Sequence, residues 1–251
     1  MSKNFKQYDS RWGSIGYPYK PYTVRGSGCG PTAVADIVCN NPDYTTITPK
    51  QVAVYMRKKG YAIAGQGTTW DGITKTLKHY GFKVKRPDTV SEFMKIVGYK
   101  NGKKGILLVN SNTAPDGTKW TSGGHYVACV GTKKKGKKKL FQIYDPGARN
   151  HNGWFNYDKS MKGCINQFWT AQLKKYKVPN VDLKKGSKNK KAVRWLQACL
   201  NKIMKSGLKI DGIFGDGTFK ELKKFQEKYK LKNDGIFRAE VRKKMIELIN
   251  K

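Results

Sequence analysis

The pattern of the sequence changes near Val178, and this change constrains the fold more than any other feature. Before it, Tyr, Gly and Trp are frequent and short apolar runs have the character of strands. After it, Lys-rich segments repeat apolar residues at helical spacing. The boundary is short, polar and contains a proline, which is typical of a linker. The sequence therefore predicts one domain over 1–175, a linker over 176–180 and a second domain over 181–251.

The first part reads as helices followed by strands. Apolar periodicity predicts helices over 30–39, 48–56 and 71–80, and strands over 105–110, 125–131 and 140–145. Six lysines around one glycine, residues 133–139, predict a hairpin turn between the last two strands. Helices first and strands afterwards indicate an α+β domain.

The second part contains a short internal repeat. The tetrapeptide Asp-Gly-Ile-Phe occurs at 211–214 and again at 234–237, each time after a helical segment in which an apolar residue precedes Gln. Apolar residues fall on one face of each of three predicted helices, over 190–205, 217–229 and 239–249. The pattern predicts a small all-α three-helix domain with Asp-Gly turns between its helices.

Cys29 stands out among five cysteines that form no CxxC pair and offer neither a disulfide framework nor a zinc site. It lies between Gly28 and Gly30, at the start of an apolar helix. Unpaired backbone N–H groups and the positive end of the helix dipole stabilise a thiolate there and lower its pKa. Cys29 is therefore the candidate nucleophile.

A thiolate nucleophile needs an acid–base partner, and the chain has three histidines. His79 falls in a predicted helix and His151 in a polar loop, whereas His125 begins a strand after two glycines that leave its ring open to a cleft. Asp145 closes the next strand, so a hairpin would bring it beside His125. This is the arrangement of a Cys-His-Asp triad.

The motifs of residues 1–175 resemble those of the papain-like, double-glycine-type cysteine peptidases of C39-like fold. The matching segments are Gln7–Gly13, Gly28–Ala33, Gly124–Val127 and Tyr144–Pro146. The resemblance implies that Cys29 is the nucleophile, His125 the general base and acid, and Asp145 the orienting group, with Asn150 as an alternative to Asp145. It also implies that the Gln7 amide joins the Cys29 backbone N–H in an oxyanion hole.

Residues 181–249 resemble the three-helix peptidoglycan-binding domain. The resemblance rests on Leu196-Gln197, Phe225-Gln226 and the two Asp-Gly turns, and it departs from the pattern after the second turn, which lacks the usual Gly-x-x-Thr. It implies that peptidoglycan contacts the turns; the expected contact residues are Asp211, Gly212, Phe214, Gly215, Asp234 and Gly235. A purely structural role of Asp211 and Gly212 in a turn that needs a positive φ is an equal alternative.

Composition limits the remaining possibilities. The formal net charge is +34, and each part holds more than twice as many Lys and Arg as Asp and Glu. Such a field favours a polyanionic partner, and Gram-positive walls carry anionic polymers. No run approaches the roughly 18 apolar residues of a membrane span, and no secretory signal peptide precedes the first domain. No cofactor or metal is expected, since no His/Cys/Asp cluster has ligand spacing.

Together these features predict a peptidoglycan hydrolase that resembles a phage endolysin, made in the host cytoplasm and acting on the wall after membrane permeabilisation. It would cleave an amide bond of the stem peptide or cross-bridge through a thioester. An N-acetylmuramoyl-L-alanine amidase on the same triad stays open. So do a leader-processing peptidase, a wall-binding protein with an inactive site, and a basic nucleic-acid-binding protein, although the scattered lysines show no readout pattern for nucleic acid.

Overall fold

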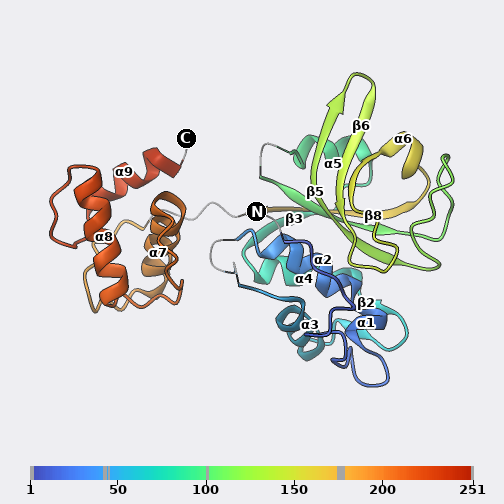
Figure 1. The fold of residues 1–251 in the computed structure, drawn as a ribbon, viewed down its shortest axis with the longest axis horizontal. Helices are drawn as coiled ribbons and strands as arrows, with labels where there is room; N and C mark the ends of the chain where they lie inside the picture. The colour runs from blue at the N-terminus through green and yellow to red at the C-terminus, as the bar shows by residue number, and fades with distance from the viewer. Residues whose placement is uncertain (1–2, 42–43, 45, 100–101, 174–178, 250–251) are drawn as a thin grey trace. The chain divides into compact units, whose positions relative to one another are not determined.

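The computed structural model describes residues 3–41, 44, 46–99, 102–173 and 179–249. Contacts divide the chain into two compact units, residues 1–174 and residues 175–251 (Figure 1). Of the predicted linker over 176–180, residues 176–178 lie outside the described residues.

The first unit is a mixed α+β domain built on one antiparallel sheet (Figure 1). Its strand order is β3-β8-β4-β5-β6-β7, and a two-strand ribbon, β1-β2, lies apart from it. The strands are β1 Ala62–Ile63, β2 Gly67–Thr68, β3 Phe82–Lys85, β4 Lys104–Val109, β5 His125–Lys135, β6 Lys138–Tyr144, β7 Gly153–Asn156 and β8 Ile165–Leu173. The helices are α1 Val24–Ser27, α2 Cys29–Val38, α3 Pro49–Lys58, α4 Trp70–His79, α5 Val90–Ile96 and α6 Tyr157–Ser160.

Both faces of the central sheet are buried, and they divide the core in two. The first cluster joins the apolar faces of α2, α3 and α4 to alternate residues of the central strands, such as Ile106 and Ala128. The second joins α5 to the residues that point the other way, such as Leu107 and Val127. Because strand side chains alternate between faces, strands buried on both sides have nearly continuous apolar sequences, as β4 and β5 do.

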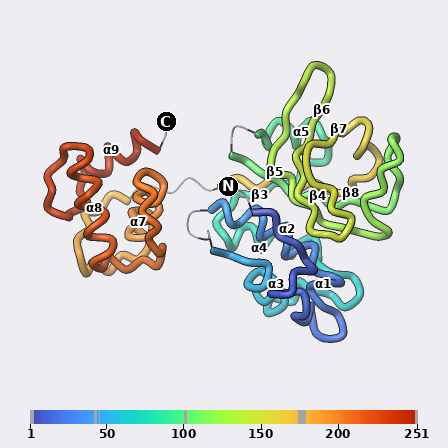
Figure 2. The backbone as a smooth tube through the Cα atoms, in the orientation of Figure 1, coloured from blue at the N-terminus to red at the C-terminus, as the bar shows by residue number. Residues whose placement is uncertain are grey.

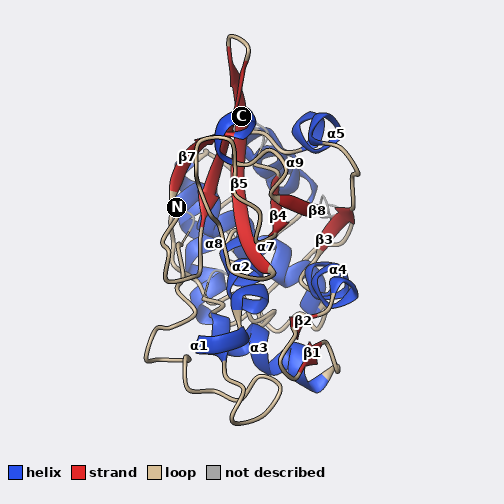
Figure 3. Ribbon diagram, turned by 90° about the vertical axis from the view of Figure 1, so that its right-hand side faces the viewer, coloured by secondary structure: helices blue, strands red, loops and turns tan. Residues whose placement is uncertain are grey.

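The three helices and three strands expected in the first part are present, and the lysine-rich tract contains the predicted hairpin turn, although most of its lysines belong to the strands. β5 continues to Lys135 and β6 begins at Lys138, so the turn itself is Gly136 and Lys137. Gly136 has a φ of +58°, which a two-residue hairpin turn requires. The lysines extend the pairing because their side chains stay in water while their backbones continue the ladder. Figure 3 shows this hairpin reaching beyond the rest of the sheet.

The second unit has the three predicted helices, α7 Lys190–Met204, α8 Asp216–Lys228 and α9 Ala239–Ile249. Their apolar faces form one core; its fully buried side chains include Val193, Leu196, Leu200, Leu222, Phe225, Val241 and Met245. An isolated bridge between Leu183 and Phe237 fastens the segment before α7 to the segment before α9. The all-α fold expected for this part is therefore present.

Candidate active site

Cys29 is the first residue of α2, and the glycines around it explain how it can be there. Gly28 is the residue before the helix, and Gly30 packs so tightly against Thr68 of β2 that a Cβ atom at this position would collide with the threonine side chain. The N–H groups of a first helical turn have no acceptor within the helix. Cys29 is partly exposed as a residue, and it lies at the positive end of a helix whose other residues are buried.

His125 and Asp145 come together because β5 and β6 are neighbours in the sheet. His125 is the first residue of β5, and Asp145 directly follows β6. The His125 Nε2 atom lies 2.7 Å from Asp145 Oδ1. The His125 side chain is 11% exposed and the Asp145 side chain 1%. With Nε2 engaged by the carboxylate, Nδ1 is the ring nitrogen left to interact with the Cys29 thiol.

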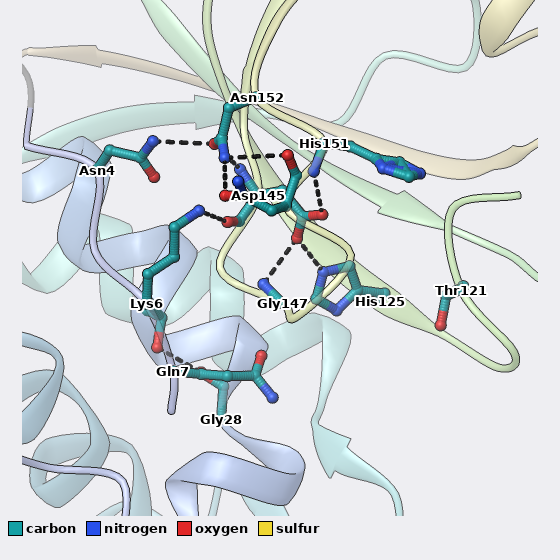
Figure 4. Close-up of polar contacts among 12 residues, drawn as sticks. Asn4, Lys6, Gln7, Gly28, Thr121, His125, Asp145, Gly147, His151 and Asn152 are labelled. Carbon is teal, nitrogen blue, oxygen red and sulfur yellow. Dashed lines mark hydrogen bonds and ion pairs between the residues drawn. The ribbon is translucent and has the colours of Figure 1, made fainter. Parts of the chain in front are cut away.

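The Asp145 carboxylate is held by the loop that follows it (Figure 4). Oδ1 also accepts the Gly147 N–H at 2.7 Å, and Oδ2 accepts the His151 N–H at 2.9 Å. The Asn152 side chain accepts the Asp145 N–H at 2.9 Å. Asn150, the alternative orienting residue, has a φ of +57° and its amide oxygen accepts a hydrogen bond from Asn152. Asp145 is thus the residue that contacts the imidazole.

The ionisable groups of this site depend on one another for their charge. Burial raises the pKa of the Cys29 thiol, but its hydrogen bond to His125 and the His125 charge outweigh burial, so the pKa lies below its usual value. Burial lowers the pKa of His125, but hydrogen bonds to Asp145 and Cys29 raise it to about 10. Burial likewise raises the pKa of Asp145, and the His125 contact brings it below its usual range. A protonated His125 therefore favours the thiolate form of Cys29 on one side and the carboxylate form of Asp145 on the other.

Gln7 reaches the same site from the N-terminal segment. Its Nε2 donates to the Arg25 carbonyl at 2.7 Å, which orients the amide, and its backbone N–H donates to the Pro146 carbonyl at 3.0 Å. The Oε1 atom is buried and has no hydrogen-bond partner among the described residues. An amide nitrogen carries two hydrogens, so one remains for a group bound in the cleft. A buried oxygen without a hydrogen-bond donor lowers the stability of the fold. Such an atom needs an explanation, and a functional role of Gln7 supplies one.

The side chains of Lys6 and Asp36 fix the segment that carries Gln7, and neither was predicted from the sequence. The Phe5 N–H donates to Asp36 Oδ1 of α2 at 2.8 Å, and Lys6 Nζ donates to the Asp145 carbonyl at 2.6 Å. These two bonds join the N-terminal segment both to the helix of Cys29 and to the strand end that bears Asp145. Figure 2 traces this segment in dark blue beside α2. The signal in the sequence was Asp36, an acidic residue inside the apolar run 33–39.

These side chains line a cleft of about 400 Å³. Its wall comes from the segments before α2, before β2, before β5 and after β6; the residues are Gln7, Gly26, Ser27, Cys29, Gly65–Gly67, Trp120–His125, Asp145 and Gly147–Arg149. Within the described ranges, no group of three or more His, Cys, Asp or Glu could hold a metal ion. A nucleophile, an acid–base group and amide donors therefore meet in one cleft, which is what acyl transfer requires.

In the second unit, the first Asp-Gly turn is clamped by a helix glutamine. Gln197 of α7 donates to Asp211 Oδ1 and to the Ile213 carbonyl, both at 3.0 Å, and accepts the Gly212 N–H at 2.9 Å. Gly212 has a φ of +78°, and Phe214 is 2% exposed in the core. Gly215 caps α8. These contacts support the structural role of the turn, and peptidoglycan contact at it stays a prediction.

The second turn repeats the clamp with one change. Gln226 of α8 accepts the Gly235 N–H at 2.8 Å and donates to Asp234 Oδ1 at 3.3 Å. Where the first turn uses Thr218, which contacts Gln197, the second uses Arg238, whose guanidinium donates to Asp234 Oδ2 at 2.6 Å. Burial raises the pKa of Asp234, but the hydrogen bond from Arg238, with two weaker ones, lowers it to about 2. The missing Gly-x-x-Thr therefore leaves the turn intact.

Comparison with known proteins adds two family matches. The family described as Peptidase_C39 like family matches residues 3–178. The family of peptidoglycan binding domains matches residues 189–245, which cover α7 and α8 and the first part of α9. No curated protein matches the chain. Within the described residues, no helix combines the length and the apolar character that crossing a bilayer requires.

Three solved structures show weak similarity. The peptidase domain of Streptococcus ComA, a bi-functional ABC transporter involved in quorum sensing, is 15% identical with a TM-score of 0.41, over 59% of this chain and 93% of that one. A C39-like peptidase from Bacillus anthracis is 14% identical with a TM-score of 0.38, over 59% and 90%. A peptidoglycan-binding protein from Clostridioides difficile is 15% identical with a TM-score of 0.25, over 57% and 92%.

Proposed function

The chain belongs to the C39-like peptidase family and carries a peptidoglycan-binding domain, and on this basis we propose that it is a cell-wall hydrolase that cleaves an amide bond of peptidoglycan. Its substrate is the stem peptide or the cross-bridge, and its nucleophile is the Cys29 thiolate. The observation that carries the proposal is the contact between His125 and Asp145, which keeps an imidazolium beside Cys29 in a cleft.

In the first half of the reaction, the Cys29 thiolate attacks the carbonyl carbon of the scissile amide. A C–S bond forms and the carbonyl oxygen becomes an oxyanion, which accepts hydrogen bonds from the Gln7 amide and the Cys29 backbone N–H. One such donor is worth about 3 kcal/mol in the transition state. The imidazolium of His125 then gives its proton to the amide nitrogen, the C–N bond breaks, and the amine leaves a thioester on Cys29.

In the second half, a water molecule attacks the thioester. Neutral His125 takes a proton from this water, and the same donors stabilise the second oxyanion. The C–S bond breaks and the carboxylic acid product departs, losing its proton to solvent. The thiolate–imidazolium pair is then restored. Asp145 keeps Nδ1 directed at Cys29 by holding Nε2 throughout.

The second unit would bring this chemistry to its substrate. A peptidoglycan-binding domain on the same chain raises the local concentration of wall peptides at the cleft. The formal net charge of +34 adds attraction to anionic wall polymers. A catalytic unit joined to a wall-binding unit is consistent with an endolysin, which is made inside the host and reaches the wall once the membrane is permeabilised. Neither insertion into a membrane nor sequence-specific binding to nucleic acid is part of this proposal.

The test is the Cys29→Ala variant, assayed on purified Gram-positive cell walls for lysis and for binding. The substitution removes the nucleophile and leaves the second unit unchanged, so lysis should disappear while the fraction of protein sedimenting with walls stays the same. Cys39→Ala is the matched control, because this thiol is buried and lies outside the cleft. Lysis that persists in Cys29→Ala contradicts the assignment of the nucleophile.

An N-acetylmuramoyl-L-alanine amidase would use the same residues on a different bond. The two activities differ in their products, because an endopeptidase frees a new amino terminus within the stem or bridge. An amidase instead frees the amino group of the first L-alanine and leaves intact MurNAc. We take the endopeptidase as the leading activity, because the glycine-rich wall of the cleft beside Cys29 suits an extended peptide on both sides of the scissile amide.

A further inference from the structure

The cleft carries one charged group that the proposed reaction does not use. Among the described residues that line it, Arg149 is the only Lys or Arg. The only carboxylate in the lining, Asp145, is fully buried and already accepts hydrogen bonds from His125, Gly147 and His151. The thiolate and imidazolium neutralise each other. The Arg149 guanidinium is thus the one cationic group of the described lining that takes no part in the proposed reaction.

The Arg149 side chain is positioned by its surroundings. It lies in the loop whose N–H groups hold Asp145, between Gly147 and His151, and its Nη2 donates to Ser122 Oγ at 3.3 Å. This contact joins the two segments that form the His125 side of the cleft. A guanidinium has five N–H donors, so most remain available for a ligand, and its planar fork matches a carboxylate.

The rest of the wall admits a peptide with small side chains. Gly26 and Gly123 face open space, where an added Cβ would meet no protein atom within 4 Å, and Gly65 and Gly124 are nearly as open. A wall without side chains lets an extended backbone lie close to Cys29. The cleft thus combines room for Gly or Ala residues with one fixed cation at its edge.

We propose that Arg149 is a specificity-determining residue that binds a free carboxylate of the substrate beside the scissile amide. This inference rests on the proposed function and narrows its substrate to acidic wall peptides. Two carboxylates of a wall peptide have this chemistry: the α-carboxylate of a D-glutamate that is linked through its side chain, and the terminal carboxylate of the D-alanine that ends the stem. Amidation removes the charge of either one.

The experiment uses four synthetic cross-linked disaccharide-peptide dimers that contain the same amide bonds. They differ only in whether the glutamate α-carboxylate, the terminal carboxylate, both or neither is amidated. Cleavage rates, as kcat/KM, are measured for the wild type, Arg149→Gln, Arg149→Lys and Lys119→Gln. Lys119 is an exposed lysine near the cleft but outside its lining, so it controls for the loss of one positive charge.

We expect amidation of the recognised carboxylate to lower kcat/KM of the wild type about fivefold, the scale of an exposed ion pair. Arg149→Gln should abolish this preference, Arg149→Lys should keep part of it, and Lys119→Gln should keep all of it. The position whose amidation matters identifies the carboxylate. A wild type that cleaves all four dimers equally, or a preference that survives in Arg149→Gln, overturns the inference and leaves the proposed function standing. If no dimer is cleaved in a Cys29-dependent way, the proposed function itself fails.

Discussion

At the scale of single residues, the site depends on burying charges that compensate one another. Asp145 is fully buried, and a carboxylate in that position would be costly without the hydrogen bonds from His125 and from two backbone N–H groups. The same interaction raises the His125 pKa to about 10, and protonated His125 in turn lowers the pKa of Cys29. Each charge therefore exists because its neighbour does, and removing one changes the titration of the others.

Asp145→Asn tests this dependence through the pH profile. In the wild type, kcat/KM should rise as Cys29 loses its proton below the usual thiol pKa, and fall as His125 loses its proton near pH 10. Asn removes the strongest influence that raises the His125 pKa, so the alkaline limb should move to lower pH while the Cys29 pKa rises. We expect roughly 100-fold lower activity at neutral pH. Rates of iodoacetamide alkylation across the same pH range report the Cys29 pKa directly. If Asp145→Asn shows the same pH profile of kcat/KM and the same Cys29 pKa as the wild type, the dependence of Cys29 and His125 on Asp145 is contradicted.

Gln7→Ala tests the oxyanion donor. Loss of one donor should lower kcat by about 100-fold or more while KM changes little, because the hydrogen bond strengthens only in the transition state. Gln7→Glu keeps the size of the side chain and removes its N–H donors, so it should lose as much. Thermal unfolding of both variants checks that the bond to the Arg25 carbonyl is not essential to the fold. A rise in KM with an unchanged kcat would instead assign Gln7 to substrate binding.

Sequence patterns could predict His125 and Asp145 as partners because both lie at the ends of strands that are neighbours along the chain. They could not predict Lys6 or Asp36, which meet the site through contacts between segments distant in sequence. Arg149 was equally hidden, since an arginine in a polar loop carries no signal of its own. Sequence patterns can predict site residues that a hairpin brings together. Site residues that meet through tertiary packing of distant segments cannot be predicted in this way.

At the scale of elements, each of the two Asp-Gly turns is held in place by a side chain of the helix that precedes it. Each turn is fastened by a buried glutamine, Gln197 in α7 and Gln226 in α8. The sequence showed the repeat and the position of these glutamines, and the structure gives the reason for that spacing. The lysine tract was less informative, because lysines are as compatible with an exposed strand as with a turn and only strand pairing decides between them.

Gln197→Leu should destabilise the second unit. The substitution fits the volume but leaves the Gly212 N–H without its acceptor and the Ile213 carbonyl with only the Thr218 hydroxyl as donor, which costs about 2 kcal/mol. Hydrogen-exchange mass spectrometry on the full chain should show faster exchange over α7 and α8 and no change around Cys29. Gln226→Leu should behave alike, and Lys220→Ala, an exposed position on α8, should have no effect. Unchanged exchange over α7 and α8 in Gln197→Leu contradicts the claim that Gln197 stabilises the first Asp-Gly turn.

At the scale of the whole molecule, catalysis and wall binding are assigned to separate units that are both strongly basic. A chain without residues 179–251 should therefore cleave a small stem peptide at the rate of the full chain, but should sediment less with purified walls. The remaining association should weaken as salt is raised, since the attraction between exposed charges is screened. Equal sedimentation of the two chains contradicts the tethering role, and loss of cleavage of the small peptide contradicts the independence of the catalytic unit.

The most direct test of the central claim is mass spectrometry of peptidoglycan digested by the full chain and by its Cys29→Ala variant. The account predicts peptide fragments with a new amino terminus inside the stem or cross-bridge, present with the wild type and absent with Cys29→Ala. Fragments that instead carry a free L-alanine amino terminus beside intact MurNAc, again only with the wild type, assign an amidase to the same cleft. Identical fragments from both proteins, or none from either, contradict a Cys29-dependent cell-wall hydrolase.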